Sequence, residues 1–507
     1  MRLSHEVLRS FTSIAPPVGL RQRLEASWFP TAVGLYLLLA AGLRFLMARS
    51  LMFDESEQLA LSQVLSLGYG SQPPLVVWLV HLATAIFGPS AATIIGVRFA
   101  ILGTVYAGLY SCARTLTRTP VRAALATATA LCVPAVCWDF VLDKTNTPLA
   151  CAMAAFTFGA VVRAVRSGST RSAVAVGFLV GLGILSKYTF LPFAAGLAFA
   201  SLTLPEYRRW ALSLRGAIAA GVAVTLVLPH AAWVIANRAE LTDGLTQSLT
   251  NRPDRLFGAL LTSAGDVLLT SCGVTLAVFA FVFRNAPKSQ AASLPSALLG
   301  RTLLFAMLTA MLVVVLAGGN RFKAHWFTPM AVLLPAFFVA RLDTAPMARW
   351  RLMGLWSAVG AIVVGTAILG VIAATTNWLP QGRQLHARDR LASELAAALA
   401  DHPESIVCDA LRDAGNLRLA CPGSPVAVLR TPLSSRPALR GPVVLVWDAS
   451  RNDAIYDETA MLLLRDYGLC PDPTATVTFV GERQSPANPG GRRLGVVRLI
   501  PKAPDAH

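Results

Sequence analysis

Carboxylates and cations recur in the short polar segments that border apolar runs of this 507-residue chain. Asp54 and Glu55 closely follow the first apolar run, and Asp143 and Lys144 lie beside a later one. Further polar side chains in such segments are Gln72, Lys187, Tyr188, Arg321, Lys323 and His325. Charged groups near a bilayer cost free energy unless they pair or meet a substrate, so this set is the first candidate for chemistry.

These residue types suit the transfer of a sugar from a lipid phosphate. A carboxylate can remove the proton from an attacking hydroxyl, and Lys or Arg can stabilise the departing phosphate. The candidate carboxylates for this step are Asp54, Glu55 and Asp143. The candidate contacts to substrate or phosphate are Glu55, Gln72, Lys187, Tyr188, Arg321, Lys323 and His325. No cysteine pair has metal-site spacing, and no P-loop or dinucleotide fingerprint occurs, so neither a metal nor a cofactor is expected.

Each candidate also has a purely structural interpretation. Asp54 could cap a helix, and Glu55 could be a charge at a helix N-terminus. Lys187 could extend along the bilayer interface towards water, and Asp143 could be an ordinary solvated loop residue. Residue type alone does not decide between these interpretations, so the elements that place the residues matter.

The composition identifies the class of protein. The chain is 55% hydrophobic and 14% charged, whereas about 25% charged residues is typical of soluble domains. It is therefore expected to be an integral membrane protein. The net charge of +17 comes mainly from arginine clusters between apolar runs, which is how a multi-span protein fixes its topology. No basic-aromatic platform is present, so nucleic acid is not an expected partner.

A bilayer core of about 30 Å needs about 20 apolar residues in one helix. On this criterion the chain has about eleven candidate spans, at 29–48, 94–114, 123–138, 147–165, 172–187, 189–204, 215–236, 258–283, 302–318, 326–341 and 352–374. The short apolar stretch 73–88 begins with Pro-Pro, which favours a re-entrant or interfacial helix. The helical apolar stripe over 58–67 predicts an interfacial helix with that stripe on the bilayer.

Alternate loops differ in charge, which predicts the topology. The candidate site residues lie in one set, whereas the other set is basic around Arg21, Arg114, Arg163, Arg208, Arg284 and Arg341. By the positive-inside rule the basic loops and the N-terminus are cytoplasmic. The candidate site and the tail then lie at the outer face of a bacterial inner membrane. Fusing the adjacent spans 172–187 and 189–204 into one would reverse every later loop.

The chain changes character after residue 376. Short β-branched runs predict a small α/β domain, with strands at 405–409, 425–429, 443–448 and 476–480. Cys408 and Cys421 would lie in an oxidising compartment, where a disulfide and two separate thiols both remain open. The predicted organisation is a cytoplasmic segment 1–28, a membrane domain 29–376 and a periplasmic α/β domain 377–507.

Several motifs occur in a recognisable order: Phe53-Asp54-Glu55, Gly68-Tyr69, Gln72-Pro73-Pro74-Leu75, Asp143-Lys144-Thr145-Asn146-Thr147-Pro148-Leu149, Leu185-Ser186-Lys187-Tyr188 and His325-Trp326-Phe327-Thr328-Pro329. Through this set the sequence resembles the bacterial protein mannosyltransferase and aminoarabinose transferase families. These are GT-C glycosyltransferases that use polyprenyl-phosphate sugars. The resemblance covers residues 29–345 and implies an α-helical polytopic membrane fold with interfacial helices in the first external loop.

The resemblance also implies roles for individual residues. Asp54 matches the acid taken as catalytic base, and Asp143 matches a second-loop acid that assists the acceptor or shapes the site. Lys187 matches a basic residue that would meet the donor phosphate. Gln72 stands where aminoarabinose transferases carry a Lys before Pro-Pro, which argues against aminoarabinose as the sugar.

The predicted function is inverting transfer of a sugar from polyprenyl phosphate to an acceptor hydroxyl. Lipid A or lipopolysaccharide, another lipid, and a protein all remain open as acceptors. A flippase or transporter of lipid-linked sugars is a second hypothesis, and a ligase of whole glycans is a third. A transporter would favour inverted repeats and charges within the spans, whereas most charges here lie in the loops.

Overall fold

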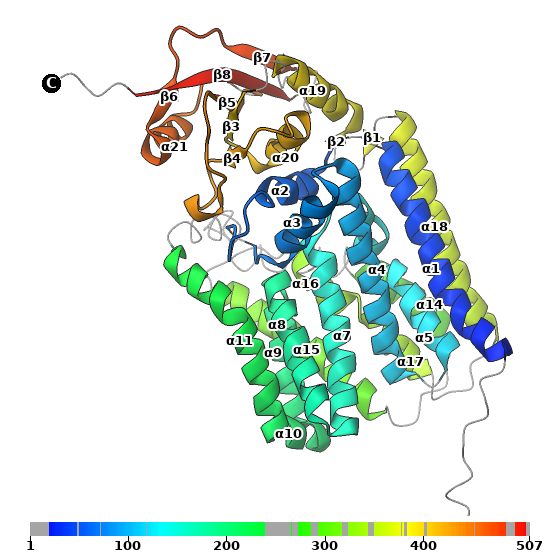
Figure 1. Cartoon of the computed structure of the whole chain (residues 1–507). Coiled ribbons are helices and arrows are strands. Elements are labelled where there is room, and N and C mark those ends of the chain that lie inside the picture. The colour runs from blue at the N-terminus through cyan, green and yellow to red at the C-terminus, as the bar shows by residue number, and fades with distance from the viewer. Residues whose placement is uncertain are drawn as a thin grey trace, which may run out of the picture.

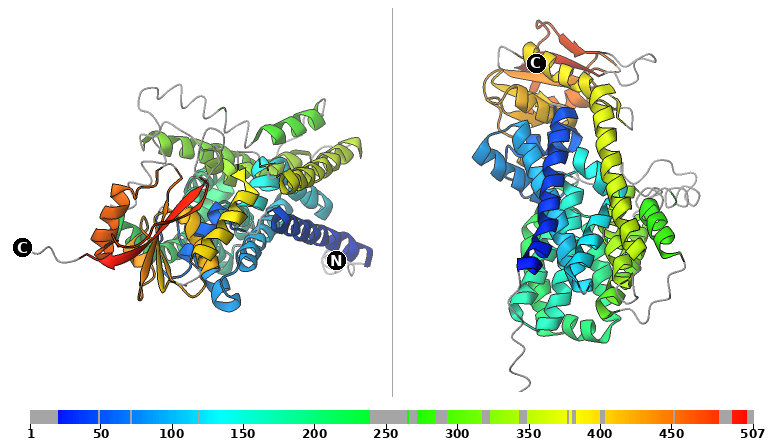
Figure 2. Two further views of the ribbon diagram at one scale, coloured as in Figure 1. Left: turned by 90° about the horizontal axis from the view of Figure 1, so that it is seen from above. Right: turned by 90° about the vertical axis from the view of Figure 1, so that its right-hand side faces the viewer.

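The computed structural model describes residues 20–47, 50–70, 72–117, 119–238, 265, 272–284, 293–316, 323–342, 349–376, 378–379, 383–399, 403–450, 452–482 and 492–502. A bundle of helices carries a small sheet domain at one end (Figure 1). The right-hand view of Figure 2 also places the sheet at that end of the bundle. The described part of the chain therefore divides into a membrane bundle and a terminal domain.

Long apolar helices form the bundle, because the bilayer core offers the backbone no other hydrogen-bond partner. By length and composition, seven helical segments of the described residues can cross a bilayer, or eight if one bent pair counts as a crossing. Six of them are α1 (Leu20–Met47), α4 (Ala91–Leu116), α7 (Asn146–Ser167), α11 (Leu214–Ala236), α15 (Leu294–Leu316) and α18 (Arg349–Thr376). The seventh comprises α16 (Ala324–Ala331) and α17 (Leu334–Leu342).

The remaining membrane helices are short or interrupted. A bend of 85° divides the stretch that follows α4, which contains α5 (Pro120–Ala128), η1 (Thr129–Cys132), η2 (Ala135–Asp139) and α6 (Phe140–Leu142). The short helices are α3 (Leu75–Phe87), α8 (Thr170–Ser186), α9 (Phe190–Leu202), α10 (Pro205–Ala211) and α14 (Val274–Phe283). Because α8 and α9 are separate helices, the adjacent predicted spans are not fused. Of the predicted span 258–283, only its last part is described as a helix.

Small residues allow close packing between helices of the bundle. A Cβ atom added to Gly196 of α9 would lie 2.4 Å from the Ala306 nitrogen of α15. One added to Gly177 of α8 would lie 2.2 Å from the Ala219 oxygen of α11. These backbone contacts fix the helices that lead into the loops near the sheet domain.

The terminal domain is a mixed sheet with helices on both faces. Its strand order is β4-β3-β5-β8-β6, with β7 also paired to β8. The strands are β3 (Ser405–Cys408), β4 (Val426–Val428), β5 (Val443–Asp448), β6 (Leu469–Pro471), β7 (Thr478–Gly481) and β8 (Arg493–Pro501). β3 is parallel to β4 and β5, whereas β8 is antiparallel to its neighbours. The predicted α/β class of this domain is therefore confirmed.

Two helices cover one face of the sheet and a third covers the other. Side chains of α19 (Leu385–Ala398) and α20 (Leu411–Ala420) pack with β3 and β4, whereas α21 (Asp457–Tyr467) packs on the opposite face. The short strands β1 (Trp378–Leu379) and β2 (Arg383–Gln384) pair between α18 and α19. Additional local structure is the 3-10 turn η5 (Leu433–Ser435). Cys408 and Cys421 are both free thiols, so the structure has no disulfide between them.

The first helix after α1 differs from its prediction. α2 spans Phe53–Leu61, so it begins and ends earlier than the predicted helix at 58–67. Leu59 and Leu61 are buried at 0% and 5% exposure, whereas Phe53 at the start of α2 is 38% exposed. α20 packs directly against α2. The expected contact with the bilayer is therefore wrong for Leu59, which packs in the bundle core, and for Leu61, which packs against Tyr69 and Val77. Leu65 and Leu67, at the end of the predicted stripe, remain exposed.

Candidate active site

Asp54 and Asp143 lie side by side at the end of the bundle that faces the sheet domain. The backbone N–H of Asp54 donates to Asp143 Oδ1 at 2.8 Å. Lys144 Nζ donates to Asp54 Oδ1 at 3.0 Å and to Asp143 Oδ2 at 3.4 Å. The Asp54 side chain is 16% exposed and that of Asp143 is 3% exposed. Two carboxylates that are distant in sequence thus share one ammonium group.

Local backbone structure fixes the Asp143–Lys144 pair. The N–H groups of Asp143 and Lys144 both donate to Asp139 O, at 3.0 and 3.1 Å. Asp139 ends η2, a π-helical turn of the kind that often occurs at functional sites. α7 starts directly afterwards, at Asn146. The bend between α5 and α7 therefore presents the acid and the cation together.

The surroundings raise the pKa values of Asp54 and Glu57 on α2. Burial raises the pKa of Asp54, and the neighbouring Asp143 carboxylate raises it further, against an opposing effect of Lys144. Burial and the Asp54 carboxylate raise the pKa of Glu57 to about 8. A raised pKa suits a general base because it lies closer to the operating pH. At neutral pH Glu57 is predominantly protonated and can donate a hydrogen bond.

Glu55 has a structural place that differs from the expected substrate contact. Its Oε2 lies 2.5 Å from Arg44 Nη2, and its Oε1 lies 2.9 Å from Arg98 Nη1. All three side chains have 0% exposure, and Met52 N donates to Glu55 Oε2 at 2.8 Å. Because neither carboxylate oxygen is exposed, the expectation of substrate contact is corrected. Glu55 joins α2 to α1 and α4, and so fixes the neighbouring Asp54.

Lys187 supplies a buried cation on another element of the same site. It follows α8, and its Nζ donates to Thr147 Oγ1 at the start of α7, at 2.6 Å. Burial lowers the pKa of Lys187 to about 8, and the Asp54 carboxylate opposes this shift. Among the described residues no carboxylate forms an ion pair with its ammonium group. This arrangement leaves its charge available to an anionic ligand.

Tyr188 connects the site to α11. Its hydroxyl lies 2.9 Å from His230 Nε2, and His230 Nδ1 lies 2.7 Å from Leu67 O. The rings of Tyr188, His230 and Trp233 stack in sequence, with centroids 5.9 and 6.2 Å apart. A Cβ on Gly68 would collide with Trp233 at 2.1 Å. The loop after α2 therefore packs tightly against this aromatic stack.

The structure describes three of the four remaining predicted site residues. Lys323 Nζ lies 5.7 Å from the centroid of the Trp326 ring. The His325 imidazole lies within electrostatic range of Lys144 and Lys187. Gln72 is half-buried in the loop between α2 and α3, whereas Arg321 lies outside the described residues.

The sequence did not assign two residues that lie next to the site, Glu57 and His230. Glu57 lies three residues after Asp54 in α2, a spacing that places both on one helical face. The sequence predicts this shared face only if the helix is taken to start at Phe53. His230 sits within an apolar run, and the sequence gives no indication of its contact with Tyr188.

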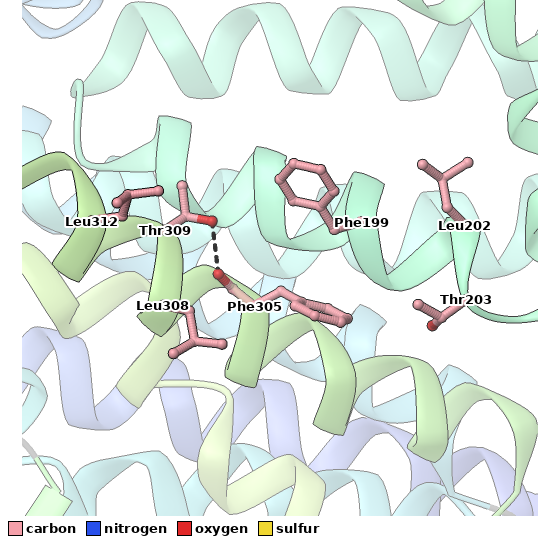
Figure 3. Close-up of a pocket in the computed structure, with 7 residues that line it drawn as sticks. All are labelled: Phe199, Leu202, Thr203, Phe305, Leu308, Thr309 and Leu312. Carbon is pink, nitrogen blue, oxygen red and sulfur yellow. Dashed lines mark hydrogen bonds between the residues drawn. The ribbon is translucent and has the colours of Figure 1, made fainter. Parts of the chain in front are cut away.

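A groove lies on the surface of the bundle between α9 and α15, apart from these charges. Its volume is about 420 Å³, and its lining is Phe199, Leu202, Thr203, Phe305, Leu308, Thr309 and Leu312 (Figure 3). The Thr309 hydroxyl already donates to Phe305 O at 2.8 Å. Because no ionisable side chain lines it, this groove is not a candidate for acid–base chemistry.

Comparisons with known proteins find similar chains. The family profile described as dolichyl-phosphate-mannose-protein mannosyltransferase matches residues 71–233. Two lipopolysaccharide core galacturonosyltransferases of Rhizobium johnstonii are similar in sequence. RgtB is 28% identical, covering 84% of this chain and 88% of its own length. RgtA is 26% identical, covering 83% of this chain and 88% of its own length.

A solved structure shares the fold. It is ArnT from Cupriavidus metallidurans bound to undecaprenyl phosphate, with a TM-score of 0.56 and 15% identity. The likeness covers 92% of this chain and 98% of that chain. Both the helical bundle and the terminal domain therefore fall within the shared architecture.

Proposed function

Because this chain is a multi-pass membrane glycosyltransferase of the GT-C class, we propose that it transfers a sugar from a polyprenyl-phosphate donor to a hydroxyl of lipopolysaccharide. The Asp54–Lys144–Asp143 arrangement carries this proposal. In it, Asp54 accepts the proton of the acceptor hydroxyl while the hydroxyl oxygen attacks the anomeric carbon. The bond to the phosphate breaks on the opposite face, which inverts that carbon.

Asp54 suits the base better than the other two acids. Glu55 is engaged by two arginines, and Asp143 accepts the Asp54 N–H and holds Lys144. The carboxylate of Asp54 is partly exposed, and its pKa is raised by burial. Lys144 already bridges the two aspartates, which supports transfer without a metal or other cofactor.

Cations on the other side of the site suit the donor. Phosphate leaves with negative charge, which a positioned ammonium group stabilises. Lys187 is the proposed phosphate contact, since its only described polar partner is the neutral Thr147 hydroxyl. Lys323 lies directly before α16 and adds a further cation from a separate element. A donor with additional negative charge would fit these two cations.

Galacturonic acid is the sugar we propose. The relatives RgtB and RgtA are named as galacturonosyltransferases of the lipopolysaccharide core, and a uronic acid adds one carboxylate to the donor. Gln72 in place of a Lys supports a sugar other than aminoarabinose. The core or lipid A part of lipopolysaccharide is then the acceptor, and the site faces the periplasm from the inner membrane. The family profile is named for a protein acceptor but matches only residues 71–233, whereas the two relatives named for lipopolysaccharide cover 84% and 83% of this chain.

The test compares two substitutions on one helix. Asp54→Asn removes the base, and we expect transfer to fall by about 10²- to 10⁴-fold. Glu57→Gln is the matched control, because the pKa of Glu57 is raised to about 8 and its protonated form resembles Gln. The measurement is mass spectrometry of envelope glycolipids from cells carrying each variant at equal membrane abundance.

A uronic acid unit present with the wild type and absent without it would identify the sugar and acceptor together. Full transfer by Asp54→Asn would overturn Asp54 as the base. A sugar unit gained on protein alone would instead favour a protein acceptor. Transfer of a whole glycan would favour a ligase.

A further inference from the structure

The terminal domain contacts the membrane bundle where α20 crosses α2, and the backbones of the two helices approach closely there. Gly415 N donates to Ser56 Oγ at 2.9 Å, and this hydroxyl donates to Leu411 O at 3.2 Å. A Cβ on Gly415 would lie 2.3 Å from Ser56 O and 2.5 Å from Ser56 Cα. Only glycine permits this approach, because the obstructing atoms are backbone and cannot rotate away.

Hydrogen bonds from α20 also hold both ends of α2. Before α2 begins, Leu51 N donates to Asn416 Oδ1 at 2.9 Å, and Asn416 Nδ2 donates to Leu51 O at 3.3 Å. Near its end, Arg418 Nη1 donates to Leu59 O at 2.6 Å and to Ser62 Oγ at 3.0 Å. Interactions at the start, middle and end of α2 constrain its tilt as well as its distance.

A strand of the sheet domain adds a further connection. Gln63 Nε2 donates to Val426 O at 2.8 Å, and Val426 N donates to Gln63 Oε1 at 2.9 Å. Val426 begins β4, and Gln63 follows α2 closely. The side chain of Gln63 thus acts like a short strand partner, so the sheet itself contacts the loop that leaves α2.

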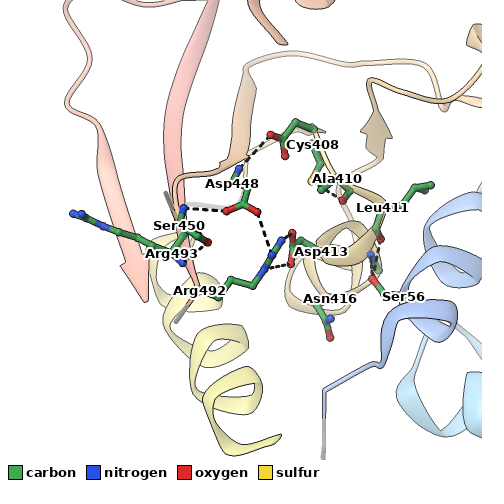
Figure 4. Close-up of polar contacts among 12 residues, drawn as sticks. Ser56, Cys408, Ala410, Leu411, Asp413, Asn416, Asp448, Ser450, Arg492 and Arg493 are labelled. Atoms are coloured by element: carbon green, nitrogen blue, oxygen red, sulfur yellow. Dashed lines mark hydrogen bonds and ion pairs between the residues drawn. The ribbon is translucent and has the colours of Figure 1, made fainter. Parts of the chain in front are cut away.

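α20 is fixed to the sheet in turn (Figure 4). Arg492 donates from Nε to Asp413 Oδ1 at 3.1 Å, and its Nη2 pairs with the second oxygen of Asp413. Arg492 Nη1 also donates to Asp448 Oδ2 at 3.2 Å, at the end of β5. Asp448 N donates to Asp409 Oδ2 at 3.2 Å. A continuous series of polar contacts therefore runs from the sheet through α20 to α2.

This series ends two residues from Asp54. We propose that the terminal domain positions the base, with Gly415, Ser56 and Arg418 as positioning residues that hold α2 through α20. The proposal rests on the proposed role of Asp54. Lys187 and His325 come from other helices, so a shift of α2 would move the base without moving the donor contacts. The consequence should therefore fall on the chemical step rather than on donor binding.

The experiment uses the full-length protein in lipid nanodiscs and two Gly→Ala variants of the same domain. Gly415→Ala introduces the backbone collision, whereas Gly423→Ala meets nothing within 4 Å. For Gly415→Ala we expect kcat to fall about 10- to 100-fold, since a misplacement near 1 Å can cost that much, with the donor KM within about twofold. The donor probe is undecaprenyl-phosphate-linked galacturonic acid with lipopolysaccharide as acceptor.

Hydrogen–deuterium exchange of the α2 amides gives a readout that does not depend on activity. We expect faster exchange in Gly415→Ala and wild-type exchange in Gly423→Ala. If Gly415→Ala does not accumulate, Arg418→Ala takes its place, because it removes two hydrogen bonds without adding atoms. Arg418→Lys keeps a donor for Leu59 O and should restore part of the rate.

Each outcome has one meaning. Unchanged exchange in α2, or unchanged kcat where Asp54→Asn is inactive, would overturn the positioning proposal. A loss confined to donor KM would also overturn it. Full activity of Asp54→Asn with altered exchange in Gly415→Ala would instead remove the proposed base while leaving the mechanical connection intact.

Discussion

Lys187 holds a charge that depends on pH near neutrality. Burial lowers the pKa of its ammonium group to about 8, compared with about 10.4 for an exposed lysine. The cation is therefore present below this value and is lost as pH rises through it. An enzyme that needs this cation for phosphate should lose activity in the same range, well before other lysines titrate.

Lys187→Arg tests this dependence. Arginine stays protonated across the accessible range, so we expect the decline of the transfer rate above pH about 8 to disappear in the variant. The shape of the pH–rate profile is the measurement, because the bulkier side chain will also lower the maximal rate. An alkaline decline identical to that of the wild type would show that another group causes it. The decline of the transfer rate at low pH, which we assign to protonation of Asp54, serves as the internal reference.

At the residue scale the sequence predicted which groups would meet, but not what each would do. Asp54, Asp143 and Lys187 were expected to converge because their loops fall at the same membrane face, and the structure brings them together. Glu55 could not be assigned in this way. Its partners Arg44 and Arg98 lie in apolar runs, and residue spacing does not show which side of α2 faces them.

At the element scale α2 depends on one buried carboxylate. Glu55 connects α2 to α1 through Arg44 and to α4 through Arg98, with no side-chain exposure at any of the three. Removing one partner of a buried ion network leaves the others uncompensated in a medium of low polarity. The orientation of α2 is thus fixed on the bundle side by Glu55 and on the side of the terminal domain by α20.

Glu55→Gln tests this connection. We expect the variant to be destabilised by about 3–5 kcal/mol, since two buried guanidinium groups lose their counter-charge. Glu458→Gln is the control, because Glu458 is 60% exposed in its pair with Arg430 and exposed pairs contribute about 0–1 kcal/mol. The apparent unfolding midpoint in nanodiscs reports the difference. Equal midpoints for the two variants would contradict a structural role for Glu55.

Elements differ in how far the sequence predicts them. Long apolar runs predict spanning helices because the bilayer allows little else, and β-branched runs predicted β3, β4, β5 and β7. For α2 the stripe that contains Leu59 and Leu61 shows periodicity without identifying its partner, since lipid and the protein interior would both satisfy it. α20 itself is short, with charged and apolar residues mixed, and gives no strong sequence signal.

At the scale of the whole molecule the candidate site lies at the end of the bundle that carries the terminal domain. The described bundle has its candidate catalytic groups next to the terminal domain, and α10 lies at the opposite end (Figure 1). α10 carries Arg208 and Arg209 in its last turn. The charge pattern of the loops predicted this separation of ends. The contact between the terminal domain and α2 was not predictable, because it depends on side chains from both parts.

The two ends should report opposite sides of the membrane. Because arginine-rich loops remain cytoplasmic, a green fluorescent protein fused after Ser213, which follows α10, is expected to fluoresce. Alkaline phosphatase fused after Lys502, beyond β8, is expected to be active, since that enzyme matures only outside the cytoplasm. The exchanged pair of fusions is the control, and both of its members should be silent. A fluorescent fusion after Lys502 would place Asp54 on the cytoplasmic side and overturn transfer at the periplasmic face.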